Sequence, residues 1–406
     1  PIAMKTVHAA FLAVVLVFTT GAAGAGEPSS LADAIAQGKI SLNARLRYEN
    51  VQQTNLLDAG AATLRTRLGV TTAPYAGWQL AAEVENIVAH DGDAYNQAGL
   101  NAAAARRAVV ADPETTELNQ LWAAFTTGKT TGTLGRQKLV LDQARFVGDV
   151  GWRQNQQTFD AFVLADKSLA RTTLTYAYLD QVNRVFSRRH AQGRFDSQSH
   201  LFNASHAALP TATVAAYAYL LDFKNSAANS CATYGVSLAG TRPVDRNLKF
   251  TYRAEFATQT DYGSSTLDYS SRYHGLEAGL AAKPGTVSVG QELLGSDHNV
   301  GFKTPLATLH AFNGWADLFL TTPAGGLRDT YLKATATLPM GIAFTGFYHW
   351  FETHKGGINL GTETDLMFSR KFGKLATVTT KLADFRRESS NIANVRKVWL
   401  QVDFAY

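Results

Sequence analysis

Apolar and polar residues alternate along most of this chain. The clearest examples are ISLNARLRYE at 40–49, LRTRLGVT at 64–71, LKFTYRAEF at 248–256 and KVWLQVDFAY at 397–406. A period of two is typical of a β-strand, because successive side chains point to opposite faces. Each of these segments therefore predicts a strand with one apolar face and one polar face.

The lengths of the segments and of their connections favour a membrane barrel. The segments run for about 9 to 13 residues, the length that a tilted strand needs to cross a bilayer. Short connections with turn residues are expected at 72–77, 127–129, 209–210, 242–245, 283–285, 339–341 and 372–374. Longer polar connections alternate with them, at 50–60, 88–116, 140–156, 183–197, 224–230, 260–269, 295–328, 353–360 and 387–394. This rhythm predicts an all-β, up-and-down transmembrane barrel of about 18 strands, with 16 as the alternative, short periplasmic turns and long external loops.

The start of the chain is predicted to be a signal peptide. Lys5 gives a positive region, Ala9 to Phe18 an apolar region, and Ala23 to Ala25 a small-residue cleavage site. Residues 1–3 precede Met4 as an extension. We therefore expect a signal peptide at 1–25, a short periplasmic segment at 26–38 and a single barrel at 39–406. Removing residues 1–25 lowers the net charge from +5 to +4. A short helix is expected near Ala102 to Arg107.

Composition excludes several other classes of protein. Charged residues make up 17% of the chain and apolar residues 46%, a combination that barrel strands with one face of each kind produce. The single cysteine, Cys231, excludes an internal disulfide and a zinc site built from several cysteines. We expect no cofactor, no metal site and no nucleic-acid partner. The expected partners are outer-membrane lipid and the solute that passes. The barrel-assembly machinery is a further expected partner during biogenesis, since the aromatic end of the last strand resembles the signal that this machinery recognises.

Three stretches carry a resemblance to a known family. They are ADPE at 111–114 with TELNQ at 116–120, LGRQ at 134–137 with RFVGDVGWRQN at 145–155 and QTFD at 157–160, and KTPLATLHAFNGWAD at 303–317. With these motifs the chain resembles the alginate-export family of outer-membrane porins, in the broad sense that includes many proteins of unassigned substrate. The resemblance implies a monomeric barrel of about 18 strands. Fold transfers well within such a family and substrate transfers poorly.

Basic residues are predicted to line the lumen. If even-numbered residues of the first strands face lipid, the lumen receives Arg45, Arg47, Arg65 and Arg67. The other candidates to bind anions there are Arg136, Arg145, Arg153, Lys249 and Arg253, with Lys138, Lys333, Lys381 and Lys397 as further basic residues. Arginine binds carboxylates well and rings of basic side chains form anion pores. We favour an anion-preferring pore, and the alternative is a wall in which these residues pair with Glu49, Glu83, Glu85, Glu117, Glu255 and Asp403.

One strand does not fit this pattern of faces. Leu134, Arg136 and Lys138 share a parity, so either Leu134 faces the lumen or the strand bulges. Aromatic residues raise a second question. Tyr176, Tyr178, Tyr348 and Trp350 are expected in the interfacial girdles of the barrel. Trp152 and Trp315 lie in connections, where they either hold a loop that folds inward, which we favour, or stack on a sugar ring.

The longest connection is predicted to narrow the pore. Residues 295–328 contain an apolar centre that would find no burial in external water. We expect this loop to fold into the barrel, with Leu309, Phe312, Asn313, Trp315 and Asp317 at the constriction. The connection at 140–156 is the second candidate.

Other functions are weaker interpretations of the sequence. An outer-membrane enzyme is disfavoured, because the histidines are scattered and no nucleophile motif is present. The segment His90 to Asp93 lacks the ligand spacing of a known calcium loop. A plugged structural barrel is a third possibility. Between channels, an uptake porin for small anions or other nutrients remains the alternative to export of an anionic or polar polysaccharide, since a passive pore has no intrinsic direction.

Overall fold

The computed structural model describes residues 27–209 and 211–406, and the predicted signal peptide at 1–25 lies outside them. The segments that alternate in the sequence form strands of 8 to 16 residues in the barrel. The main strands are β1 (Lys39–Gln53), β2 (Ala59–Thr71), β3 (Trp78–Ala89), β4 (Thr115–Thr127), β5 (Thr130–Gln137), β6 (Thr158–Asp166), β7 (Thr172–Asn183), β8 (Arg194–Leu209), β9 (Ala212–Leu221), β10 (Cys231–Pro243), β11 (Lys249–Thr260), β12 (Ser270–Ala282), β13 (Gly285–Leu294), β16 (Leu327–Leu338), β17 (Ile342–Glu352), β18 (Asn359–Phe372), β19 (Ala376–Arg387) and β20 (Val395–Ala405). Short elements are α1 (Leu31–Ala36), β14 (Ser296–Asp297), β15 (Val300–Gly301) and four 3-10 turns, η1 (Ala102–Ala104), η2 (Ala227–Asn229), η3 (Leu309–Ala311) and η4 (Pro339–Gly341).

The sheet is a closed barrel of 18 antiparallel strands. Each strand pairs with the next along the chain, and β1 pairs with β20, with Arg45 opposite Asp403. Closure leaves no unpaired strand edge, as a wall surrounded by hydrocarbon requires. The predicted fold and strand number are confirmed, and the alternative of 16 strands is wrong.

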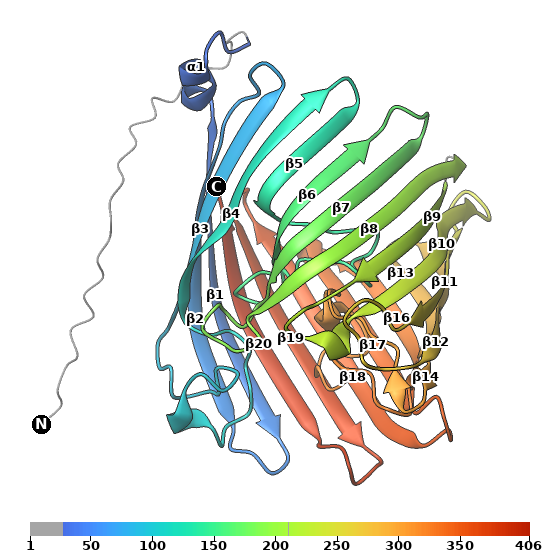
Figure 1. The fold of residues 1–406 in the computed structure, drawn as a ribbon. Coiled ribbons are helices and arrows are strands. Elements are labelled where there is room, and N and C mark those ends of the chain that lie inside the picture. The colour runs from blue at the N-terminus through green and yellow to red at the C-terminus, as the bar shows by residue number, and fades with distance from the viewer. Residues whose placement is uncertain (1–26, 210) are drawn as a thin grey trace, which may run out of the picture.

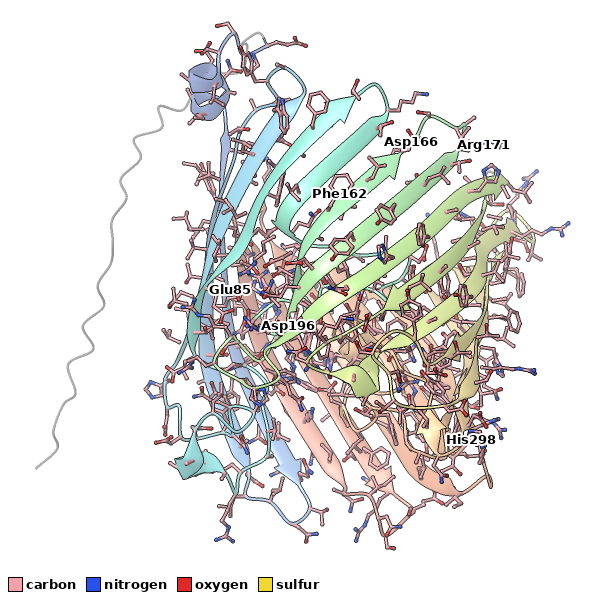
Figure 2. All side chains as sticks on the ribbon, in the orientation of Figure 1. Glu85, Phe162, Asp166, Arg171, Asp196 and His298 are labelled. Carbon is pink, nitrogen blue, oxygen red and sulfur yellow. The ribbon has the colours of Figure 1, made fainter. Side chains whose placement is uncertain are left out.

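The two ends of the barrel differ, as Figure 1 shows. One end carries only short turns, and α1 lies beside them, where the Ala73 N–H donates to the Ala34 carbonyl over 2.9 Å. All the long loops lie at the other end. Seven short turns fall where the sequence predicted them, and an eighth, at 167–171 between β6 and β7, was not predicted. Asp166 and Arg171 mark this turn in Figure 2, whereas His298 lies toward the loop end.

The outer face of the barrel is apolar. On β1, Leu46 is 57% exposed and the neighbouring Arg47 is 1% exposed. On β2, Leu68 is exposed and Arg67 is buried. Phe162, labelled on β6 in Figure 2, belongs to the same exposed set. So extensive an apolar surface is suited to lipid and not to water.

The middle of the barrel is filled by two loops that fold inward. The β5–β6 loop (138–157) contributes Phe146, which packs against Tyr217 and Tyr273 of the wall at centroid distances of 5.4 and 5.2 Å. The β13–β16 loop (295–326) contributes Phe302, which packs against the same Phe146 at 6.0 Å. Loop residues thus supply much of the buried core. The predicted helix near Ala102 is only the 3-10 turn η1.

The pairing of β5 shows on which face of the barrel Leu134 and Arg136 lie. Arg136 lies opposite Leu121 on β4 and Asp160 on β6. Cross-strand partners share a face, and Leu121 and Leu134 are both strongly exposed. Arg136 therefore lies on the outer face, where it pairs with Asp160 over 2.6 Å. The prediction that Arg136 lines the lumen is wrong. Leu134 and Arg136 are two residues apart on one strand and share a face, and the apolar Leu134 faces outward.

Candidate functional site

The two inward loops join each other inside the barrel. The Gly148 N–H donates to the Leu306 carbonyl over 2.9 Å, and the Thr308 N–H donates to the Ala144 carbonyl over 3.0 Å. The Gln157 side chain donates to the same Leu306 carbonyl over 3.1 Å. These bonds satisfy loop backbone groups that the interior removes from water. The loops consequently form one body across the lumen.

Arginines of the first two strands hold the β5–β6 loop. Arg45 Nη1 donates to the carbonyls of Gly151 and Trp152, each over 3.0 Å. Arg47 Nη2 donates to the Trp152 carbonyl over 2.5 Å, and its guanidinium lies 4.2 Å from the centroid of the Trp152 ring. Arg67 donates to the Gln154 carbonyl over 3.2 Å. These guanidinium groups lie on the lumen side, but loop carbonyls occupy much of their donor capacity.

Most of the basic residues predicted in the lumen also have carboxylate partners. The pairs are Arg45–Asp403, Arg47–Asp112, Arg67–Glu85, Arg145–Glu292, Arg153–Glu49 and Arg253–Glu255. These contacts are of the kind that the alternative interpretation expected, but two of the acids, Asp112 and Glu292, were not among those it named. Glu83 and Glu117, which it did name, form no ion pair in the described residues. Arg65 differs, because its Nε and Nη1 are buried without a hydrogen-bond partner in the described residues. Within the described residues, the one hydrogen bond of its guanidinium group goes to the Asn43 side chain.

Buried acids of the wall hold the β13–β16 loop. The Trp315 N–H donates to Asp365 over 3.0 Å, and the Ala316 N–H donates to Glu363 over 2.6 Å. Asn313 donates to Glu292 over 2.7 Å. Because carboxylates are strong acceptors for backbone N–H groups, these contacts fix the segment 313–316 in place.

Asp317 is the central acid where the two loops meet. Arg153 of the β5–β6 loop and Lys397 of β20 each lie 2.8 Å from it, and His310 lies 2.7 Å from it. Burial alone would raise the pKa of Asp317, but His310, Lys397 and Arg153 together hold it well below its usual range. Burial lowers the pKa of His310 well below its usual range, assisted by Lys381. A neutral His310 fits the contacts, since one ring nitrogen faces Asp317 and the other accepts from Lys381 over 2.6 Å.

Tryptophan rings surround the ammonium group of Lys381. It lies 3.5 Å from the Trp315 centroid and 4.3 Å from the Trp152 centroid. Trp152 also stacks on His310 with centroids 4.7 Å apart. Both loop tryptophans therefore bind groups of the protein itself and hold the inward loops, the role that we favoured over stacking on a sugar.

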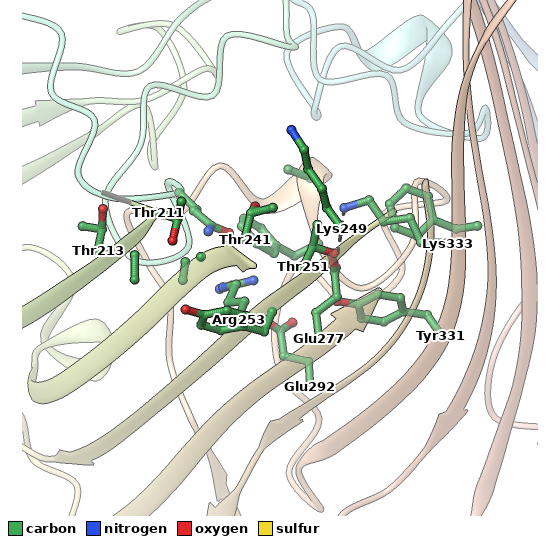
Figure 3. Close-up of a pocket in the computed structure, with 18 of the residues that line it drawn as sticks. Thr211, Thr213, Thr241, Lys249, Thr251, Arg253, Glu277, Glu292, Tyr331 and Lys333 are labelled. Atoms are coloured by element: carbon green, nitrogen blue, oxygen red, sulfur yellow. Dashed lines mark hydrogen bonds and ion pairs between the residues drawn. The ribbon is translucent and has the colours of Figure 1, made fainter. Parts of the chain in front are cut away.

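A cavity of about 890 Å³ lies between the loops and the turn end. Its wall comes from β8 to β13, β16 and β17, and the loop residues Phe312 and Asn313 close it on the far side. Figure 3 shows Lys249, Arg253, Glu277 and Lys333 around this space. Lys333 lies 3.5 Å from Glu277. Lys249, one of the predicted residues, lines the cavity and forms no ion pair within the described chain.

A second cavity, of about 560 Å³, lies on the loop side. It is lined by the β7–β8 loop, the β9–β10 loop and the β13–β16 loop, including Arg184, Phe302, Lys303 and Leu309. It shares no residue with the first cavity. The turn η3 and Phe312 thus separate the two spaces, with Leu309 on the loop side and Phe312 on the turn side.

The predicted constriction residues are brought together in part. Leu309, Phe312 and Asn313 form the partition between the cavities. Trp315 and Asp317 instead lie in the packed contact between loop and wall. Sequence reasoning missed several residues of this region, namely Arg184, Lys303, His310, Glu363 and Asp365. The two acids alternate with Thr362 and Thr364 on β18, which was the one signal that they face the lumen.

In residues 27–209 and 211–406, no helix is long and apolar enough to cross a membrane. Within the same ranges, no group of three or more His, Cys, Asp or Glu side chains is arranged to hold a metal ion.

Known proteins resemble this chain in sequence and in fold. A family model described as "Alginate export" matches residues 37–283. No curated protein matches the chain. Among solved structures, Acinetobacter baumannii OccAB4 has a TM-score of 0.73 at 13% identity, covering 91% of this chain and 98% of that chain. Pseudomonas aeruginosa OpdK, solved with vanillate, has a TM-score of 0.72 at 14% identity, covering 92% and 99%. At such identities the structural likeness concerns the fold.

Proposed function

This chain belongs to the alginate export family and is a channel of the bacterial outer membrane, and we propose that it admits small organic anions into the periplasm. The long loops then face the outside and the short turns face the periplasm. A solute would enter the loop-side cavity, pass the partition formed by η3 and Phe312, and leave through the turn-side cavity.

The size of the two cavities is the observation that carries this proposal. Volumes of about 560 and 890 Å³ fall within the range of pockets for single small molecules. A polysaccharide chain would need one continuous passage. Here η3 and Phe312 of the β13–β16 loop stand between the two spaces, so a polymer could pass only if this segment moved aside.

Charge supports an anionic solute. The loop-side cavity carries Arg184 and Lys303, neither of which forms an ion pair in the described part of the chain. The turn-side cavity adds Lys249. Cations without partners attract anions into a narrow, partly desolvated space. A relative in fold, OpdK, was solved with vanillate, a small aromatic acid.

Polymer export remains the second candidate, because the family model is named for alginate export. Proteoliposomes distinguish the two functions. We expect them to take up benzoate or gluconate faster than the neutral sugar glucose, and to retain an oligomer of mannuronic acid. Passage of the oligomer at a rate comparable to benzoate would contradict the proposal and favour export. Reversal potentials in a sodium benzoate gradient should show preference for the anion.

A further inference from the structure

We propose that a hollow between the β10–β11 and β12–β13 turns binds the headgroup of an anionic phospholipid of the surrounding membrane. This inference does not depend on which solute passes through the channel. It concerns the turn rim, which consists of the eight short connections 72–77, 128–129, 167–171, 210–211, 244–248, 283–284, 339–341 and 373–375. In the orientation proposed above, this rim faces the periplasm, and the membrane leaflet beside it consists of phospholipid.

Basic residues far outnumber acidic residues in the turn rim. Asp245 is its one acidic residue, whereas six residues are basic, namely Lys129, Lys167, Arg171, Arg246, Lys283 and Lys374. All six are exposed, and none forms an ion pair with an acid of the described chain. Arg171 marks this end of the barrel in Figure 2. Such an excess of exposed cations attracts anions to the turn rim.

Three basic residues at this end line one hollow. It has a volume of about 570 Å³, and its lining includes Arg246, Lys249 and Lys283 together with the Asn247 amide. No acidic side chain of residues 27–209 and 211–406 lines it. The carboxylate of the adjacent Asp245 accepts from the N–H groups of Asn247 and Leu248 over 2.7 and 2.9 Å, and it pairs with none of the three cations. Three positive side chains therefore surround a space that is large enough for a phosphate group and its substituent.

A phosphate diester with no charge of its own to offset is the anion that suits this lining. Guanidinium and ammonium groups both donate charge-assisted hydrogen bonds to phosphate oxygens. An anion between three like charges also relieves their mutual repulsion. A zwitterionic headgroup such as phosphocholine would instead bring a further cation into the hollow. The hydroxyl groups of phosphoglycerol carry no charge, and the Asn247 amide can both donate to them and accept from them.

The surrounding surface indicates that this phosphate belongs to a lipid. Lys249 lies opposite Ala281 in the pairing of β11 with β12, and the next pair along these strands is Phe250 with Leu280. Phe250 and Leu280 are both exposed on the outer face of the barrel. Val244, in the β10–β11 turn itself, is 59% exposed. The apolar wall that acyl chains contact thus begins one residue from the cations, as a phospholipid requires and a soluble phosphate does not.

Native mass spectrometry of the purified protein in detergent tests this site, because it counts the lipid molecules that remain bound. Phosphatidylglycerol is the anionic probe, and phosphatidylcholine with the same acyl chains is the zwitterionic probe. We expect the first phosphatidylglycerol molecule to bind roughly fivefold or more tightly than phosphatidylcholine. The double variant R246Q/K283Q should weaken phosphatidylglycerol binding roughly tenfold or more, since each basic residue near an anionic lipid surface typically contributes about a factor of five. Lys249 stays unchanged in this variant, because it also lines the turn-side cavity.

The matched control is R106Q/K355Q, which removes two exposed basic residues at the loop end that form no ion pair in the described chain. It should bind phosphatidylglycerol as the unmodified protein does. Equal binding of the two lipids to the unmodified protein would overturn the proposed site, and so would unchanged phosphatidylglycerol binding by a folded R246Q/K283Q. If the double variant does not fold, the comparison of the two lipids on the unmodified protein still decides. A protein that binds inorganic phosphate in calorimetry but does not distinguish the two lipids would assign the hollow to a soluble phosphate and reject the lipid.

Discussion

Arg153 of the β5–β6 loop and Asp317 of the β13–β16 loop form an ion pair of 2.8 Å inside the barrel. Both side chains are almost completely buried, at 8% and 6% exposure. The same Asp317 pairs with Lys397 of the wall. One carboxylate thus joins both loops to β20.

Replacing Asp317 with Asn should release the loops. The change leaves Lys397 and part of Arg153 buried without their counter-charge, which typically costs roughly 3–5 kcal/mol. We expect a lower midpoint of urea unfolding, followed by tryptophan fluorescence, and more frequent current fluctuations in planar bilayers. The matched control is D384N, which removes an acid paired with Arg386 on the exposed rim. A D317N protein as stable and as quiet as D384N would show that the pair does not hold the loops.

Removing the partition should widen the pore. Deletion of residues 304–323, closed by Gly-Ser, takes away η3, Phe312 and the contacts to Glu363 and Asp365. The barrel pairing of β13 with β16 lies outside the deletion, so the folded band on a denaturing gel should persist. We expect single-channel conductance to rise several-fold. Unchanged conductance in a folded deletion protein would assign the constriction to the β5–β6 loop.

Acid should loosen the loops through His310. Burial lowers the pKa of His310, so a state in which the loops are open takes up a proton at higher pH than the closed state does. The contribution of His310 to the free energy of loop closure is therefore fully present above the ordinary histidine pKa of about 6.5, and it is lost as the pH falls below that value. The charged groups that face the ring are Asp317, Lys381 and Arg153.

We expect current fluctuations to be more frequent at pH 5 than at pH 8. H310Q, which keeps a neutral polar side chain, should remove this difference. Asp317 does not interfere with the test, because its lowered pKa places its own titration below this range. A pH response that is the same in H310Q would exclude His310 as its origin.

The barrel could be predicted from the sequence because its cause is local and repeated. In segments such as 40–49, the alternation of apolar and polar residues indicates which face each side chain lies on. The length of the segments matches the thickness of a bilayer. The turn between Asp166 and Arg171 was not predicted, because it contains no Pro or Gly. Arg136 was assigned to the wrong face, because we expected charged side chains to face the lumen. Its strand instead places it on the same outer face as Leu134.

The site was predicted less well, because it depends on contacts between distant segments. The sequence indicates that the apolar centre of 295–328 must find burial, and Leu309 and Phe312 do lie at the partition. It does not indicate that Arg153 would meet Asp317, 164 residues away. For the same reason, a free arginine and a paired one, such as Arg184 and Arg47, look identical in the sequence.

A single methyl group at Gly314 should test how tightly the β13–β16 loop is held. Gly314 has φ +84°, and a Cβ there would meet the carboxylate of Glu363, the acid that accepts from the Ala316 N–H. Gly314→Ala therefore combines backbone strain of about 1–2 kcal/mol with a steric clash at the anchoring acid. Gly373→Ala is the matched control, because Gly373 has φ +62° and open space around its Cβ position. We expect G314A to raise conductance fluctuations in planar bilayers well above those of G373A, with both barrels folded on a denaturing gel. If G314A shows no more conductance fluctuations than G373A, the clash with Glu363 does not loosen the loop.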